Sequence, residues 1–375
     1  MPTRPSVRRA NRIPGYAALA IGAAVVVAFP LVAQFVDGSA DEFSGDSFAI
    51  WPAIGWLLCA ALVAVVVTRH LQIGTSAEVE IGSGLALAFD GLPMLLSIPW
   101  VIVVFAAWGG HVLLATAAGG LCLYHVLLLA PRLMSAPTPA WVAGAPKLQL
   151  VVANVFVDNR SPAAAARQLV GTGGDVLVLV ESTADFMTVF DDNGGATSYP
   201  NRVADPDRES DYAVTIATDK ELGPRSEFRA LGPLRVAIAD IDVDGTSMLI
   251  VALNPMATLD QGGHETWKEQ IRVLAELVPT LEGPVVIAGD LNSTRYRPEF
   301  EQIIGLGYSD AIDSLGKGLN SSFKLHARSS LGAVVRLDHA LVNDGVHAVA
   351  MRNLDACGSD HLPFSLELAV RRPGE

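Results

Sequence analysis

Long apolar runs, separated by short polar breaks, fill the first 135 residues of the chain. Residues 15–36 and 49–68 contain no charged residue, and a third apolar block from 91 to 130 is interrupted at Gly109-Gly110-His111. About 20 apolar residues in a helix cross a bilayer. The pattern therefore predicts a transmembrane region over 1–133, with spans at about 15–36, 49–68, 92–108 and 111–130. One span plus a re-entrant piece is the alternative for the third block.

From residue 147 the pattern changes to short apolar runs rich in β-branched residues, separated by turns and a few helical stretches. A segment rich in Pro, Ala and Gly, 134–146, precedes it and is predicted to be a linker, with an interfacial segment as the alternative. The domain over 147–371 is expected to be α/β, with two packed sheets and helices outside. The predicted strands are 148–157, 175–182, 212–218, 284–293, 334–342 and 364–370, the hairpin is 234–255, and the helices are 162–173 and 265–281.

Composition and charge follow the same division. The chain is 51% hydrophobic and 17% charged, with a net charge of −13. Before residue 140 there are 6 Lys and Arg against 7 Asp and Glu, and after it there are 20 against 32. The C-terminal part therefore carries nearly all of the negative charge. Affinity for nucleic acid comes largely from clustered Lys and Arg, so a nucleic-acid partner is not expected.

Polar residues stand where the predicted strands stop. Asn154 interrupts the first strand, and Glu181 follows the second. Asp290 and Asn292 follow another strand, Asp338 and His339 follow "VVRL", and Asp360 and His361 precede the last strand. One such acid is commonly a surface residue, but five strand ends of this kind predict a cluster. Carboxylate and amide oxygens with one His suit Mg²⁺ or Mn²⁺.

These residues, in this order, resemble the signature of the endonuclease/exonuclease/phosphatase superfamily. The resemblance rests on Asn154 in "VVANV", Glu181 in "DVLVLVES", and the segments "GDLNST" (289–294), "RLDHALV" (336–342) and "GSDH" (358–361). It covers about 147–370. With the apolar N-terminal block, the chain is similar to the bacterial membrane-anchored, VanJ-like branch. The resemblance implies a four-layer α/β sandwich with the active site at one edge.

The resemblance also implies roles for the matching residues. Glu181 is the main metal ligand, assisted by Asn154 and Asp360. Asp290 orients or deprotonates the attacking water, and Asn292 holds the phosphate. His361 contacts the phosphate and is polarised by Asp338. These roles suit phosphoester hydrolysis, which needs a metal to neutralise charge and donors aimed at the phosphoryl oxygens.

One position departs from the family pattern. Many members have a His at the end of the strand that here reads "LIVALNPMA" (249–257), and this chain has Asn254. We interpret Asn254 as a substrate contact and the exchange as a change in substrate or leaving group. His264, ten residues on, could take the place of that histidine in space, but it is expected to be a solvated loop residue. Strand alternation directs His339 away from its neighbour Asp338, so His339 is expected to be structural.

The resulting hypothesis is a Mg²⁺-dependent (or Mn²⁺-dependent) phosphoesterase or pyrophosphatase tethered to the bacterial plasma membrane. Its partners would be membrane lipids and a phosphorylated lipid or a small phosphoester substrate. The alternatives are a membrane-anchored nuclease and a catalytically inactive binding module of the same fold. The N-terminal arginines predict a cytoplasmic N-terminus. The family branch then favours an extracytoplasmic catalytic domain, whereas a count of four spans favours the opposite side.

Overall fold

The computed structural model describes residues 50–75, 83–207, 209–258, 262–325, 327 and 332–374. The chain divides into two compact units, Met1–Ala130 and Pro131–Glu375. We call them the helical unit and the C-terminal unit. The predicted span at 15–36 lies outside the described residues.

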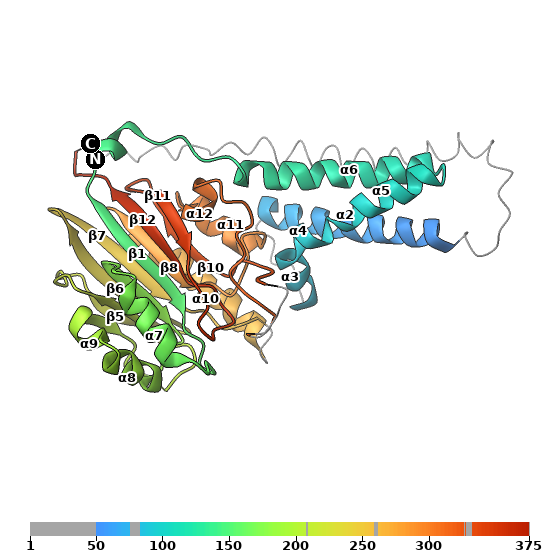
Figure 1. Ribbon diagram of the computed structural model, residues 1–375. Coiled ribbons are helices and arrows are strands. Elements are labelled where there is room, and N and C mark those ends of the chain that lie inside the picture. The colour runs from blue at the N-terminus through green and yellow to red at the C-terminus, as the bar shows by residue number, and fades with distance from the viewer. Residues whose placement is uncertain are drawn as a thin grey trace. The chain divides into compact units, whose positions relative to one another are not determined.

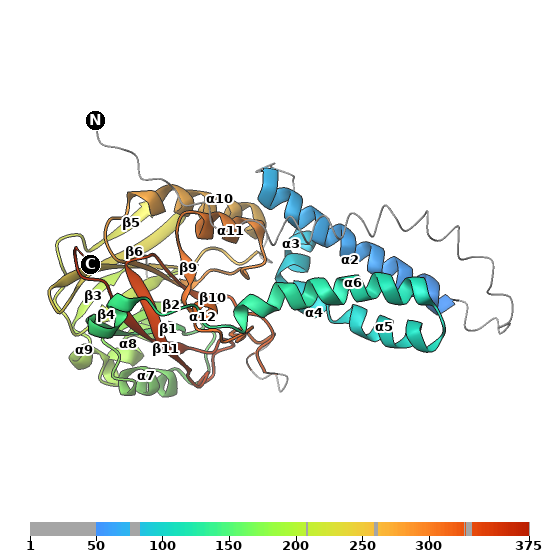
Figure 2. The same cartoon turned by 90° about the horizontal axis from the view of Figure 1, so that it is seen from above.

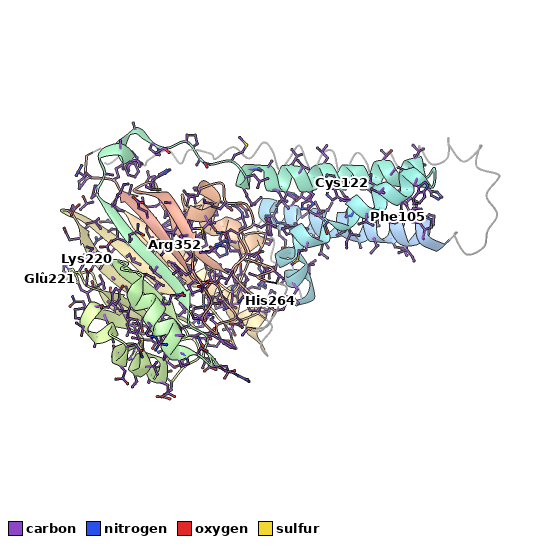
Figure 3. The ribbon with its side chains drawn as sticks, in the orientation of Figure 1. Phe105, Cys122, Lys220, Glu221, His264 and Arg352 are labelled. Atoms are coloured by element: carbon purple, nitrogen blue, oxygen red, sulfur yellow. The ribbon has the colours of Figure 1, made fainter. Side chains whose placement is uncertain are left out.

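Five helices make up the described part of the helical unit: α2 (Ile50–Thr75), α3 (Ser83–Asp90), α4 (Leu92–Leu95), α5 (Ile98–Trp108) and α6 (Val112–Leu129). Two stretches are long and apolar enough to cross a membrane, Trp51–Gln72 and Val112–Arg132. A bent pair, Gly84–Asp90 with Leu92–Trp108, could be a third, with an angle of 76° at its break. The helices break at Gly109-Gly110-His111, where the sequence predicts a break. Outward side chains are apolar, as at Phe105 (Figure 3).

Helices α2 and α6 run in the same direction, and the α4–α5 segment, which comes between them in sequence, runs back along α6 (Figures 1 and 2). Near the start of both helices, a Cβ at Gly55 would lie 2.9 Å from Leu114 Cδ2. Near their ends, His70 Nε2 lies 3.0 Å from the hydroxyl of Tyr124. The bent pair therefore carries the chain back from the end of α2 to the start of α6.

The C-terminal unit contains two six-stranded mixed sheets. The first has the order β11-β12-β1-β2-β4-β3 and the second the order β5-β6-β7-β8-β10-β9. The strands of the first sheet are β1 (Lys147–Asn154), β2 (Val176–Val180), β3 (Asn201–Ala204), β4 (Val214–Thr218), β11 (Val346–Asn353) and β12 (Phe364–Val370). Those of the second are β5 (Glu227–Leu231), β6 (Leu234–Val243), β7 (Thr246–Leu253), β8 (Val285–Asp290), β9 (Ser309–Asp310) and β10 (Asp338–Val342).

Helices cover the outer face of each sheet, so the unit has four layers (Figure 2). Against the first sheet lie α7 (Pro162–Gly171), α8 (Ala184–Asp192) and α9 (Gly195–Ser198), and against the second lie α10 (Gly263–Leu277) and α11 (Pro298–Gly305). A short helix, α12 (Ala311–Ser314), follows β9, and 3-10 turns occur at Ala130–Arg132, Ala140–Gly144 and Val278–Thr280. The predicted α/β class and four-layer sandwich are confirmed.

Three apolar clusters hold these layers together. Inward residues of both sheets, such as Val152, Val178, Ile250 and Val286, form the central one. Two outer clusters join α7 and α8 to the first sheet and α10 and α11 to the second. Strands β2 and β8 are buried along their whole length, because each has apolar layers on both faces.

Most predicted elements are present with shorter bounds. The hairpin turn at Asp244-Gly245 is confirmed, since both residues have positive φ, 50° and 84°, as a type I′ turn requires. The strand predicted over 334–342 is partly wrong. It begins only at Asp338, because the preceding residues pair with Phe323 instead of the sheet. Asp338 therefore opens a strand rather than following one.

Candidate active site

The polar residues at the predicted strand ends converge at one edge of the sandwich. Parallel β1 and β2 end there at Asn154 and Val180, and parallel β7 and β8 end there at Leu253 and Asp290. Strands β10 and β12 run antiparallel to their neighbours β8 and β1. Their first residues therefore lie at the same edge as their neighbours' last ones. This is why residues that precede a strand meet residues that follow one.

Asn154 links the two sheets at this edge. Its Nδ2 donates to Glu181 Oε1 at 2.7 Å and to Asp290 Oδ2 at 3.1 Å. Its Oδ1 accepts from the N–H of Phe156 at 2.9 Å. In this geometry Asn154 presents donors to the two carboxylates, and its amide would have to turn to offer oxygen to a metal.

Glu181 follows β2 in a left-handed conformation, with φ of 56°. Such a backbone is unusual for a residue other than Gly or Asn and commonly marks functional sites. Its Oε2 accepts from the N–H of Val157 at 2.8 Å. Burial raises the pKa of Glu181 to about 7; its hydrogen bonds act in the opposite direction, and the charge of Asp290 adds to the increase.

Asp290 is the last residue of β8 and is buried. Its Oδ1 accepts from the N–H of Asn292 at 2.8 Å. Asn292 also has a positive φ, 48°, and its Nδ2 donates to the carbonyl of Pro255 at 2.9 Å and to Asn254 Oδ1 at 3.4 Å. The turn after β8 thus closes around the carboxylate and joins Asn292 to the end of β7.

His361 lies between two carboxylates. Its Nδ1 is 2.7 Å from Asp338 Oδ2, and its Nε2 is 3.6 Å from Asp290 Oδ2. Asp338 and Asp290 are direct partners in the β10–β8 ladder, so the sheet itself fixes their separation. All three side chains are buried.

The charges in this cluster act on one another. Burial would lower the pKa of His361, but the charges of Asp338 and Asp290 raise it to about 10. Burial would raise the pKa of Asp338, but the charge and hydrogen bond of His361 hold it below its usual value. Burial raises the pKa of Asp290 above its usual value, and although the charge of His361 opposes this, that of Asp338 adds to it. The arrangement stabilises an imidazolium beside a carboxylate that can take up a proton.

The donor set at this edge fits a divalent cation. Ligand atoms of Asp290, Asp338 and His361 lie within 4.8 Å of one another, and they could hold a metal ion together only with His361 in its neutral form. Asp338 Oδ1 is buried and accepts no hydrogen bond from the described part of the chain. With Glu181 nearby, acceptor oxygens outnumber donors. A cation would relieve that imbalance.

Asp360 stands next to His361, and its charge is among those that raise the pKa of that imidazole. The main-chain carbonyl of Asp360 accepts from the N–H of Lys324 at 2.8 Å. Asp360 lies outside the group of three side chains whose ligand atoms gather most closely. The structure therefore brings all the predicted residues to one edge, and their individual roles stay predictions.

A second buried His–Asp pair supports the loop after β8. His339 Nδ1 lies 2.6 Å from Asp310 Oδ2, and its Nε2 lies 3.1 Å from the carbonyl of Ser293. Asp310 Oδ1 also accepts from the first N–H groups of α12. His339 thus faces away from Asp338, in agreement with strand alternation, and it holds the "GDLNST" segment in place.

The prediction that His264 is a solvated loop residue is wrong. His264 lies in the first turn of α10 and is only 8% exposed (Figure 3), on the same face of the helix as the buried Trp267 and Ile271. Neither ring nitrogen of His264 has a hydrogen-bond partner among the described residues. The sequence also places His326 in a predicted loop that could face the site, and this residue lies outside the described residues.

Three residues at the site were not assigned roles from the sequence. Ser359 Oγ donates to the carbonyl of Asn154 at 2.9 Å and accepts from the N–H of His361 at 3.0 Å. Ser322 Oγ accepts from the N–H groups of Leu337 and Asp338, both at 3.1 Å. The ring of Phe323 lies 5.0 Å from that of His361. Only Ser359 had a sequence signal, its place in "GSDH".

Comparisons with solved structures show the same fold in other proteins. Solved structures with this fold include a humanized TDP2 from D. rerio with 14 mutations (19% identity, 60% of this chain and 99% of that chain, TM-score 0.50). D. rerio TDP2 with a single-strand DNA product matches equally (20% identity, 60% and 99%, TM-score 0.50). Sphingomyelinase C from Streptomyces griseocarneus is more distant (17% identity, 59% and 99%, TM-score 0.43).

At these identities the structural likeness shows the fold alone. No curated protein matches the chain by sequence. The model of the Endonuclease/Exonuclease/phosphatase family, however, matches residues 151–361. That range is more than half of the chain and reaches from β1 to His361. The chain therefore belongs to the endonuclease/exonuclease/phosphatase family.

Proposed function

We propose that the protein is a membrane-tethered, divalent-metal-dependent phosphoesterase or pyrophosphatase. The observation that carries this proposal is the buried Asp338–His361–Asp290 cluster at the sheet edge, with the Asn154–Glu181 pair beside it. Acid, base and cation-binding groups stand within one site. That combination is what hydrolysis of a phosphoester requires.

Glu181, Asn154 and Asp360 would hold the cation, and the oxygen-rich donor set favours Mg²⁺ or Mn²⁺. When bound, the cation would neutralise the negative charge that develops on the phosphoryl oxygens. The raised pKa of Glu181 supports this assignment, because a desolvated carboxylate beside Asp290 gains most from a nearby positive charge.

The remaining residues act on water and phosphate. Asp290 accepts the proton of the attacking water, and its raised pKa brings it closer to the neutral range in which a base works best. His361, kept as an imidazolium by Asp338, donates a hydrogen bond to a phosphoryl oxygen. Asn292 is the second donor to the phosphate.

Asn254 is the further substrate contact. Its Oδ1 is engaged by Asn292 at 3.4 Å, while its Nδ2 is buried without an acceptor within the part of the chain that the structure describes. A phosphoryl oxygen would supply that acceptor. Asn254 cannot deliver a proton as a histidine could, so the leaving group would have to depart without one from this position.

The substrate class follows from the tether and the charge. A phospholipid or lipid-linked phosphoester shares the interface with a site tethered beside the membrane. The C-terminal part carries 20 Lys and Arg against 32 Asp and Glu, which disfavours a polyanion such as DNA. A membrane-anchored nuclease is the second candidate, since TDP2 of D. rerio binds a DNA product. An inactive binding module would rest on Asn254 alone.

A substrate panel tests the function. The full-length protein in nanodiscs should hydrolyse bis(p-nitrophenyl) phosphate and a phospholipid with Mg²⁺ or Mn²⁺, and EDTA should remove at least about 99% of the rate. Phosphate or headgroup release is the measurement. Cutting of plasmid DNA at lower protein concentration than the lipid would favour the nuclease. No metal binding and no turnover would favour the binding module.

The protein is proposed to be integral to the bacterial plasma membrane. The family resemblance favours an extracytoplasmic C-terminal unit, but the directions of the helices support the opposite side. Because α2 and α6 run parallel, the bent pair between them crosses back, and together with the predicted span at 15–36 this makes four crossings. Arg69 and Arg132 then stand at the same end, and positive residues favour the cytoplasm.

A reporter fusion at the C-terminus checks this topology. We expect green fluorescent protein fused after residue 375 to fluoresce and alkaline phosphatase fused there to be inactive, since both report a cytoplasmic end. Fusions after residue 75 should behave in the same way, and fusions after residue 110 should give the reverse pattern. An active phosphatase at the C-terminus would restore the extracytoplasmic placement and make external lipid intermediates the substrates to test.

A further inference from the structure

The last candidate span, Val112–Arg132, runs into the C-terminal unit, since Pro131 and Arg132 already belong to that unit. Arg132 is 7% exposed, and its guanidinium lies 4.8 Å from the centre of the Tyr296 ring. Its Nε lies 3.8 Å from Asp313 Oδ2. Tyr296 follows the "GDLNST" segment of the active site. Arg132, at the start of the C-terminal unit, is therefore held close to the loop that carries Asn292.

Main-chain hydrogen bonds extend this attachment. Gly318 N–H donates to the carbonyl of Arg132, and Ala136 N–H donates to that of Ser314, both at 2.7 Å. A Cβ at Gly316 would lie 2.6 Å from the nitrogen of Ser135, so glycine is needed for the two segments to approach. Residues 132–136 and 314–318 therefore lie side by side, directly after the candidate span.

Exposed apolar side chains gather on these two segments and on the loop that follows. Among the described residues of the C-terminal unit, six large apolar side chains are exposed, and four are here: Leu133 (67%), Met134 (70%), Leu319 (42%) and Leu325 (69%). Leu133 Cδ2 would lie 3.2 Å from a Cβ at Gly318, next to Leu319. Lys317 is exposed on the same segment. Such a concentration is unusual for a surface that faces only water.

The same loop reaches the active site. Phe323 pairs with His361 in an isolated bridge, and Leu362 N–H donates to the carbonyl of Ser322 at 2.7 Å. Only a few residues separate Leu319 at the exit from Phe323 at the catalytic imidazole. The apolar surface and the His361 side of the site thus belong to one short stretch of chain.

We propose that Leu133, Met134, Lys317, Leu319 and Leu325 form a membrane-contact surface. It lies in the headgroup region of the bilayer entered by the preceding helices, and it presents the Phe323–His361 side of the site to phospholipid. Apolar side chains enter the acyl boundary there, and a lysine pairs with anionic headgroups. This rests on the proposed function, because it takes the helices to be inserted and a lipid phosphoester to be the substrate.

Collisional quenching in nanodiscs tests the surface without any activity. A fluorophore would be attached to Leu319→Cys, Leu325→Cys or the control Leu306→Cys. Each variant would also carry Cys357→Ser, which removes the partly exposed native thiol, and the other two cysteines, Cys59 and Cys122, are buried. Leu306 lies at the end of α11 and is 42% exposed, as Leu319 is. Nitroxide phospholipids should quench positions 319 and 325 at least about twofold more than 306.

Equal quenching at the three positions would overturn the proposal. A difference in quenching that appears only when a disc holds two protein copies would also overturn it, because it would indicate contact between copies. Leu319→Asp with Leu325→Asp should lower the ratio of phospholipid hydrolysis to bis(p-nitrophenyl) phosphate hydrolysis about tenfold, and Leu306→Asp should not. If the unmodified protein hydrolyses neither substrate, the proposed function fails while the quenching result still decides the surface.

Discussion

Asp290→Asn should lower kcat for bis(p-nitrophenyl) phosphate by about 10²- to 10⁴-fold, the usual contribution of a general base. Asparagine has the shape of aspartate and can still accept the N–H of Asn292 through Oδ1. It cannot take a proton from water. The cluster loses the negative charge that faces His361 Nε2 at 3.6 Å and the oxygen that accepts from Asn154 Nδ2 at 3.1 Å. Steady-state kinetics in nanodiscs with saturating Mg²⁺ are the measurement.

Asp192→Asn is the matched control, since Asp192 is an exposed carboxylate at the end of α8. It should leave kcat within about twofold of the unmodified protein, as surface changes usually do. Thermal unfolding of both variants separates lost chemistry from lost fold. If Asp290→Asn and His361→Asn both keep full activity, the Asp338–His361–Asp290 cluster is not the active site, whatever its burial and geometry.

The sequence predicted those site residues that belong to local patterns. Asn154, Glu181 and Asp290 end apolar runs, and a buried strand followed by an acid is visible in the order of residues alone. That they meet is a property of the sheets, since Asn154 joins Asp290 across 136 positions of sequence. The resemblance supplied this long-range information, and it also supplied the His361–Asp338 pairing.

Other features depend on packing that no local pattern encodes. The start of β10 at Asp338 follows from its pairing with Asp290 and from the bridge of Val335 to Phe323, both long-range contacts. His264 was expected in a solvated loop, but it lies in the first turn of α10 among the buried residues of that helix. The parallel course of α2 and α6 likewise depends on contacts between helices. Periodicity predicted the elements but not their directions.

Gly289 shows how closely the fold constrains the site. It precedes Asp290 in β8, has a φ of 145°, and lies opposite Leu253 in the parallel β7–β8 ladder. A Cβ at this position would lie 2.0 Å from the carbonyl oxygen of Leu253 and 3.2 Å from its carbonyl carbon. Both contacts are with backbone, so no side chain can move aside to make room.

Gly289→Ala should therefore destabilise the C-terminal unit by about 3 to 5 kcal/mol, combining overpacking with a backbone conformation that alanine disfavours. The midpoint temperature of thermal unfolding of the full-length protein should fall by about 10 °C. Gly283→Ala is the control. Gly283 also has a positive φ, 85°, but a Cβ there would meet nothing within 4 Å, so its cost should be only about 1 kcal/mol. If the two variants lost the same stability, the backbones of β7 and β8 would lie further apart at Gly289 and Leu253 than they do in the structure. Asp290 would then be held by its hydrogen bonds rather than by the sheet.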